Sequence, residues 1–265
     1  QYTISLFYIS KNKKRVAKKI NNNEVLNVVF VVQYIPGWNK LELIYSKMLK
    51  DNRFNPIILC IPLNVQNNKL LNDNGNDTYQ YFVENGYKSI NSLNEDGSWF
   101  DLTKLAPDYV FHSRPYNSFM PTVYTSDNIV KHALICNVLY GMSVTKDIRS
   151  ITINKDYFKD VFCYFASDFK EKEYYKQRFR LGFLFNIQKC NVAGAVALEH
   201  ILQFKTYTTH KRFSKSIIWT PRWSTDLNIG GSNFFNYKST IFELAKEHPE
   251  VLFIIRPHPL MFSNF

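Results

Sequence analysis

The sequence has 265 residues, of which 45% are apolar, and its net charge is +11 at pH 7. This composition is typical of a globular chain that buries a core, and it excludes an intrinsically disordered chain. No apolar run approaches the roughly 20 residues that a membrane-spanning helix needs. The basic balance favours an anionic partner, such as a phosphorylated substrate, a nucleic acid or an acidic membrane face.

Much of the positive charge lies in one short run near the start of the chain. The run "KNKKRVAKK" (11–19) has six basic residues and no acidic one, and we interpret residues 1–23 as a basic leader. It is either a solvated segment or an attachment to anionic lipid, worth about 1 kcal/mol per basic residue. An RNA-binding arm would need aromatic residues among the basic ones, and the run has none. We therefore expect no nucleic-acid partner and a cytoplasmic protein, peripheral on the inner face of a bacterial membrane.

Strand and helix patterns alternate along the next part of the chain. "EVLNVVFVVQ" (24–33) is a continuous apolar run, typical of a strand buried on both faces. Residues 37–51 have the apolar spacing of an amphipathic helix. Further strands are predicted at 55–63, 88–91, 107–113, 132–141, 163–166 and 189–195, with helices at 77–87, after 166 and at 196–204. This order predicts an α/β fold with a mostly parallel sheet, and residues 24–204 form a Rossmann-like domain.

A second, shorter series of elements follows a polar segment. Residues 205–215 are polar and basic, and we interpret them as a linker. Strands are predicted at the start of "SIIWTPRWS" and at "VLFIIRP", with a helix at 237–250 between them. Because two strands and one helix are too few to close a core, residues 216–265 are expected to be an incomplete second Rossmann-like domain.

The four cysteines, far apart in the sequence, each lie in an apolar stretch. Buried free thiols in a reducing cytoplasm are therefore favoured over disulfides. No zinc or EF-hand spacing is present, so we expect neither a metal nor a cofactor. These cysteines are Cys60, Cys136, Cys163 and Cys190.

In open α/β sheets ligands bind beyond the carboxyl ends of the strands, and "WTPRWS" leaves a predicted strand there. Arg222 is suited to grip a phosphate, with Thr220 and Ser224 as hydroxyl donors. Trp223 offers a flat ring for stacking on a base. The alternative is that the indoles pack in the core and Arg222 is an ordinary surface residue.

The next strand exit, "RPHP", places Arg256 and His258 two residues apart. In an extended chain such residues point the same way, and the prolines stiffen the exit. Arg256 would neutralise a phosphate, and His258 would donate a proton to its leaving oxygen. The alternative is a rigid turn with an exposed histidine.

Two loops of the first domain also carry candidate ligand contacts. Arg114 and Tyr116 follow the strand at 107–113, while Tyr140 and Gly141 follow the next strand. Gly141 permits close approach of the backbone to a ligand, and Tyr140 is either a substrate contact or a packing residue. His112 alternates with apolar neighbours, which favours a core histidine.

Together the segments "TPRWS", "RPHPLMF", "PDYVFHSRPYN" and "NVLYG" resemble the CDP-glycerol glycerophosphotransferase family of teichoic-acid and capsule-type transferases, in its surface-carbohydrate branch. The resemblance covers residues 24–265 and implies a GT-B fold, with two Rossmann-like domains. It implies that the donor pyrophosphate is held by the catalytic Arg256 and His258. The residues implied to line the donor site are Thr220, Pro221, Arg222, Trp223 and Ser224, and those on the acceptor side are Arg114, Tyr116, Tyr140 and Gly141.

The implied reaction is transfer of a polyol phosphate from a CDP-activated donor to a hydroxyl of a glycan or lipid-linked acceptor. Tyr140 stands where teichoic-acid polymerases of the family have histidine, and a phenol with a pKa near 10 is a poor base. The family continues beyond "RPHP", so the chain is expected to be an inactive fragment. The alternatives are a GT-B glycosyltransferase that uses a nucleotide sugar and a non-catalytic domain that binds an anionic polymer or membrane.

Overall fold

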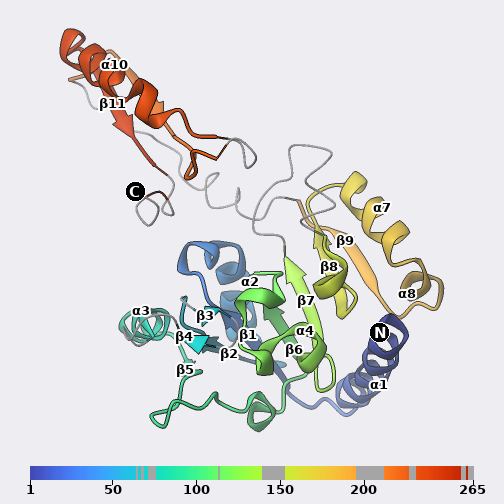
Figure 1. Ribbon diagram of the computed structural model, residues 1–265. Helices are drawn as coiled ribbons and strands as arrows, with labels where there is room; N and C mark the ends of the chain where they lie inside the picture. Colours follow the sequence, from blue (N-terminus) through green and yellow to red (C-terminus); the bar gives the residue numbers. More distant parts are fainter. Residues whose placement is uncertain are drawn as a thin grey trace. The chain divides into compact units, whose positions relative to one another are not determined.

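A computed structural model describes residues 1–63, 65–66, 69–70, 76–112, 114–138, 153–194, 212–226, 231–257 and 261. The chain forms two compact units, Gln1–Gln203 (unit 1) and Phe204–Phe265 (unit 2). The elements of both units are labelled in Figure 1.

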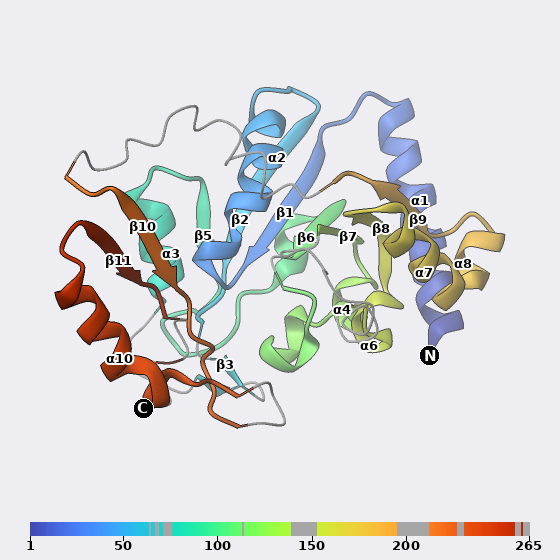
Figure 2. The ribbon, with the colours of Figure 1, turned by 90° about the horizontal axis from the view of Figure 1, so that it is seen from above.

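Unit 1 is built on a seven-stranded sheet in which every neighbouring pair is parallel, as Figure 2 shows. The strands lie in the order β5-β2-β1-β6-β7-β8-β9. Their bounds are β1 (Leu26–Val32), β2 (Phe54–Cys60), β5 (Ser89–Asn91), β6 (Tyr109–His112), β7 (Leu134–Val138), β8 (Val161–Ala166) and β9 (Lys189–Val192). Residues 28–32 of β1 are 0% exposed, as expected for a central strand covered on both faces.

Short helices connect these strands. The α-helices are α1 (Tyr2–Asn21), α2 (Asn39–Leu49), α3 (Asp77–Glu84), α4 (Ser126–Ile129), α6 (Lys155–Phe158), α7 (Phe169–Arg178) and α8 (Arg180–Leu184). Single 3-10 turns are η1 (Ile35–Gly37), η2 (Leu102–Leu105), η3 (Asn117–Phe119) and η4 (Thr122–Tyr124), and β3 (Val65–Gln66) pairs antiparallel with β4 (Lys69–Leu70). None of the described helices is long and apolar enough to cross a membrane.

Aromatic rings fill the core between α2 and the sheet. The Phe30 ring of β1 stacks on Phe111 of β6 with centroids 5.1 Å apart, and it meets Trp38 and Tyr45 edge-on. Trp38 in turn packs edge-on against Phe82 of α3 at 5.0 Å. Edge-to-face pairs of this kind add about 0.5–1.5 kcal/mol each beyond the area they bury.

The predicted α/β fold with a parallel sheet is confirmed. Continuous apolar runs predict β1, β2 and β6–β8, and helical spacing predicts α2 and α3. The cap of α3 is Asn76, whose side chain accepts from Tyr79 N. The predicted helix at 196–204 lies outside the described residues.

The sequence does not predict α1, because lysines dominate the segment that we interpreted as a leader. In the structure Leu6, Ile9 and Val16 of this helix are buried against unit 1. Asn12 is buried with them, and its amide donates to Val130 O at 2.8 Å. The segment is therefore an integral helix of the fold.

A buried carboxylate, Asp108, fixes α1 to the amino ends of β1 and β6. Its oxygens accept from Arg15 Nη1 at 2.5 Å and from Lys19 Nζ at 2.8 Å. The backbone N–H of Asn27 donates to it at 2.9 Å. Asp108 is 0% exposed, so it depends on these partners in place of water.

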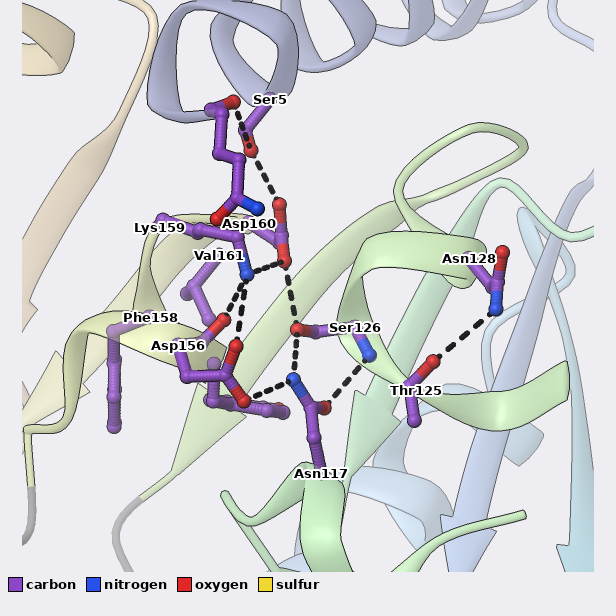
Figure 3. Close-up of polar contacts among 12 residues, drawn as sticks. Ser5, Asn117, Thr125, Ser126, Asn128, Asp156, Phe158, Lys159, Asp160 and Val161 are labelled. Carbon is purple, nitrogen blue, oxygen red and sulfur yellow. Dashed lines mark hydrogen bonds and ion pairs between the residues drawn. The ribbon is translucent and has the colours of Figure 1, made fainter. Parts of the chain in front are cut away.

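A second buried carboxylate, Asp160, holds the start of the same helix, as Figure 3 shows. Ser5 Oγ donates to Asp160 at 2.5 Å and Ser126 Oγ donates at 2.7 Å. Lys159 Nζ lies 3.2 Å from the same carboxylate. Burial raises the pKa of Asp160, and these partners oppose that rise.

Unit 2 contains a strand–helix–strand segment. Its elements are β10 (Lys215–Trp219), α10 (Phe234–Glu247) and β11 (Val251–Ile255). The two strands are parallel, and the Trp219 ring stacks on Phe234 at the start of α10, with centroids 5.1 Å apart. The predicted strand–helix–strand order is confirmed.

Replacing Asp108 with alanine should destabilise unit 1 by about 3 kcal/mol, since a buried ion pair is broken and α1 loses its attachment. Urea unfolding followed by circular dichroism measures this change. Asp51→Ala breaks the exposed pair with Arg53 and should leave the midpoint nearly unchanged. Equal shifts for the two variants would contradict the role of Asp108.

Candidate functional site

The strand order of unit 1 reverses direction between β1 and β6. Strands β2 and β5 continue on one side of this point, and β7–β9 continue on the other. In open α/β sheets ligands bind at the carboxyl ends of the strands beside such a switch point. The residues that leave β1 and β6 therefore define the candidate site of unit 1.

Gln33 and Arg114 leave these two strands and contact each other. Arg114 Nη1 donates to Gln33 Oε1 at 3.3 Å, and the Arg114 guanidinium lies 4.6 Å from the centre of the Phe119 ring. The buried Gln33 amide also donates to Phe119 O at 2.7 Å. Arg114 itself is half-buried, so a cation is held at this edge in a fixed orientation.

His112, the last residue of β6, is fully buried below this edge. Its Nδ1 lies 2.8 Å from the Tyr157 hydroxyl, and its Nε2 lies 3.2 Å from Tyr124 O. Because a carbonyl only accepts, the proton is on Nε2 and Nδ1 accepts from Tyr157. Burial lowers the pKa of His112 to about 4, so the ring is neutral, as predicted for a core histidine.

Lys40 is a fully buried cationic side chain at the same edge. It lies in the first turn of α2, and its Nζ donates to Val138 O at the end of β7, at 2.8 Å. Burial holds the pKa of Lys40 well below its usual range. Buried lysines with lowered pKa values are common at functional sites, where they act as bases or stabilise negative charge.

Neither Gln33 nor Lys40 was predicted as a site residue. Gln33 directly follows the apolar run of β1, so the strand-end criterion applied to the other loops would have found it. Lys40 is hidden in an amphipathic pattern, although a lysine in the first turn of a helix opposes the helix dipole and is a detectable signal.

In unit 2 the exits of β10 and β11 lie side by side. Trp219 pairs with Ile255, and Arg256 N donates to Trp219 O at 2.9 Å, which continues the pairing by one residue. Arg222 and Arg256 follow these two strands and are exposed. The loop after Trp219 then turns toward the start of α10, where Ser232 N donates to Ser224 O at 2.6 Å.

Some predicted site residues are placed by the structure and others are not. Thr220 is exposed, Pro221 and Ser224 are buried, and Trp223 is half-buried in the first loop of unit 2. Tyr116 is half-buried beside Phe119, with ring centroids 6.1 Å apart. Three predicted residues, Tyr140, Gly141 and His258, lie outside the described residues.

All four cysteines are free and buried, as predicted. Burial raises the pKa of Cys60 to about 12 and of Cys163 to about 11, so these thiols are poor nucleophiles. Across the described ranges, no three histidine, cysteine or carboxylate side chains gather as a metal site.

A cavity lies elsewhere, on one face of the sheet. It has a volume of about 530 Å³ and is lined largely by apolar side chains, among them Leu26, Phe54 and Tyr109, the first residues of β1, β2 and β6. These residues begin their strands, whereas Gln33 and Arg114 follow theirs. The cavity therefore does not contain the site at the strand exits.

No protein-family model matches this chain, and no curated protein matches it. A solved structure of S. aureus MnaA with UDP matches 90% of this chain and 64% of its own, with a TM-score of 0.56 and 11% identity. UDP-N-acetylglucosamine 2-epimerase from Rickettsia bellii matches 91% and 64%, with a TM-score of 0.51 and 14% identity. The chain thus spans less than two thirds of either structure, and the likeness establishes a GT-B-like α/β fold.

These matches correct the resemblance to CDP-glycerol glycerophosphotransferases, which is wrong, as is the phosphotransferase activity inferred from it. The structures that match are a UDP complex and a UDP-N-acetylglucosamine 2-epimerase. The error has a physical origin. Short cationic segments at neighbouring strand exits suit any diphosphate ligand, so they do not distinguish one enzyme family of this fold from another.

The neutral His112 should make unit 1 less stable in acid. The pKa of His112, about 4, lies below the value near 6.5 of a histidine in an unfolded chain. The contribution of His112 to the free energy of unfolding is therefore complete above about pH 6.5 and is lost as the pH falls toward 4. Between about pH 8 and pH 5 this loss amounts to about 2 kcal/mol. Urea unfolding at several pH values measures it.

Two histidine variants separate this effect from general acid denaturation. His112→Gln keeps a side-chain amide donor and should flatten the pH dependence of the unfolding free energy. His248→Gln changes an exposed histidine of unit 2 and should keep the wild-type pH dependence. If His112→Gln also keeps the wild-type pH dependence, the buried histidine is not the source of that dependence.

Proposed function

We propose that this chain binds a UDP-sugar and belongs to an enzyme that uses such a nucleotide sugar as its substrate. The observation that carries the proposal is the pair of strand exits in unit 2. Two exposed arginines, Arg222 and Arg256, follow adjacent parallel strands. The fold likeness to a UDP complex and a UDP-sugar epimerase supports the same ligand class.

The chemistry of these exits suits the diphosphate of a nucleotide sugar. A guanidinium forms two parallel hydrogen bonds with phosphate oxygens and stays charged at any physiological pH. Between the strands, α10 begins at Phe234, and the Asn233 side chain makes no capping bond there. Phe234 N donates instead to Ser232 Oγ at 3.3 Å and Asn236 N donates to Asn233 O at 3.1 Å, so the two arginines carry the argument for a diphosphate.

The edge of unit 1 is proposed as a second ligand-contacting surface of the same enzyme. Arg114, held by Gln33 and Phe119, supplies an oriented and partly exposed cation at the strand exits, which suits a phosphate oxygen or another anionic part of the ligand. Lys40 is fully buried and its Nζ donates to Val138 O, so it holds the exit of β7 in place and does not contact the ligand itself.

Titration calorimetry with UDP and UDP-N-acetylglucosamine tests the nucleotide site. Arg256→Ala and Arg222→Ala should each weaken binding about 10- to 100-fold, because each removes charge-assisted hydrogen bonds to a diphosphate. Arg212→Ala is the matched control, because this exposed arginine lies before β10 and therefore at the opposite end of the strand from Arg222. It should bind as the wild type does.

Two results would contradict the proposal. One is equal loss of affinity in the Arg212 and Arg256 variants, which would indicate a general charge effect. The other is tighter binding of CDP-glycerol than of UDP or UDP-N-acetylglucosamine.

A further inference from the structure

The basic run of α1 divides into two sets of side chains with different surroundings. Arg15 and Lys19 point inward and bind the buried Asp108. Lys11, Lys14 and Lys18 are exposed, and none of them forms an ion pair with the described part of the chain. Folding therefore explains Arg15 and Lys19, and also Lys13, whose Nζ donates to Asn186 O, but it does not explain the three exposed lysines.

The outward lysines share one stripe of the helix with an exposed aromatic ring. Phe7, Lys11, Lys14 and Lys18 follow each other at spacings of four, three and four residues, which places them on the same face. Phe7 is 64% exposed. The stripe is therefore apolar near its start and cationic toward its end.

The short helix α8 lies beside α1, as both Figure 1 and Figure 2 show. Gly182 N donates to the Tyr2 hydroxyl at 3.0 Å, and this hydroxyl lies 2.9 Å from Phe179 O. Farther along α1, Lys13 Nζ donates to Asn186 O at 2.5 Å. These contacts hold the two helices together at the β9 edge of the sheet.

α8 adds large apolar side chains to the exposed side of this pair. Leu184 and Phe185 are 69% and 65% exposed, and Leu181 is exposed as well. Arg180, at the start of α8, is exposed and adds another cation. Neither helix contains an aspartate or glutamate, so nothing in them offsets the positive charge.

We propose that α1 and α8 form a docking surface for an anionic lipid bilayer. This α1–α8 surface consists of Phe7, Leu181, Leu184 and Phe185 with Lys11, Lys14, Lys18 and Arg180. The lysines attract the anionic headgroups, and the aromatic and aliphatic side chains enter the boundary between headgroups and acyl chains. The inference does not depend on the nucleotide that unit 2 binds.

The mixture of side chains favours a bilayer over a nucleic acid or another protein. A site for single-stranded RNA stacks successive bases on aromatic rings, whereas two of the four apolar side chains of this surface are leucines, which offer no ring for stacking. A protein interface is usually depleted of lysine at its centre. Exposed leucine and phenylalanine on the same pair of helices as exposed lysines match the composition of interfacial membrane helices.

Vesicle flotation with the full 265-residue chain tests the proposal. The chain should bind phosphatidylcholine vesicles that contain phosphatidylglycerol, bind pure phosphatidylcholine weakly, and dissociate as salt rises above about 0.1 M. Each lysine changes such partitioning about fivefold, so the double variant Lys11→Glu/Lys14→Glu should bind at least about twentyfold more weakly. Lys47→Glu/Lys88→Glu, which makes the same charge change on exposed lysines outside the surface, should bind almost as the wild type does.

A fluorescent probe tests the apolar part separately. Phe7→Cys labelled with an environment-sensitive dye should shift to the blue on anionic vesicles, and the four buried native cysteines should remain unlabelled. Val83→Cys on α3, 50% exposed near the opposite edge of the sheet, should keep its aqueous spectrum. Circular dichroism confirms that each variant is folded.

Several results would overturn the proposal. They are no binding to anionic vesicles at low salt, equal loss of binding in both double variants, or no spectral shift at position 7. Binding of a single-stranded RNA that depends on Lys11 and Lys14, without vesicle binding, would overturn it in favour of a nucleic acid. Nucleotide titrations of the same variants should be unchanged, so failure here is distinguishable from failure of the UDP-sugar site.

Discussion

The carboxylate of Asp108 lies in the interior at the amino ends of β1 and β6, and it has to be neutralised there. An unpaired buried charge would cost several kcal/mol, so the chain has to bring cations to it. Arg15 and Lys19 come from a helix that precedes the sheet in sequence, about 90 residues from their partner. This one interaction connects the first helix of the chain to its central strands and fixes which face of α1 points inward.

Fixing one face of α1 also determines what its other face can do. The inward face of α1 carries Ile9, Asn12 and Val16, and the lysines that point outward, Lys11, Lys14 and Lys18, lie on the opposite side of its axis. The same basic run therefore contributes to folding and leaves a cationic surface. At the other end of the sheet, the carboxyl ends of β1 and β6 hold Gln33 and Arg114, which folding also positions. The amino ends of these strands hold the Asp108 contacts and border the largely apolar cavity, whereas their carboxyl ends lead into polar and charged groups that suit an anion.

The central strands could be predicted from sequence because a parallel sheet covered on both faces requires continuous apolar runs. α1 could not be predicted in this way, since its buried residues are separated by lysines whose partner, Asp108, is distant in sequence. Gln33 and Lys40 were missed for a related reason. Their surroundings come from strands and a helix that only the tertiary fold brings together. The position of Gln33 directly after a strand and of Lys40 in the first turn of a helix were nevertheless usable signals.

The predicted family was wrong, because a short cationic motif contacts only a small part of a ligand. Arg222 and Arg256 follow the adjacent parallel strands β10 and β11, and in our proposal they bind a phosphate-sized anion there. The two arginines do not indicate which base or which further group the ligand carries, because those parts of a ligand are recognised by side chains from many other loops. A similar limit applies to the lysines of α1. Their spacing predicts a cationic face, but only the exposed Leu184 and Phe185 favour a lipid bilayer as its partner. In both proposals the charge favours an anionic ligand, and only other side chains that fold nearby can favour one anionic molecule over another.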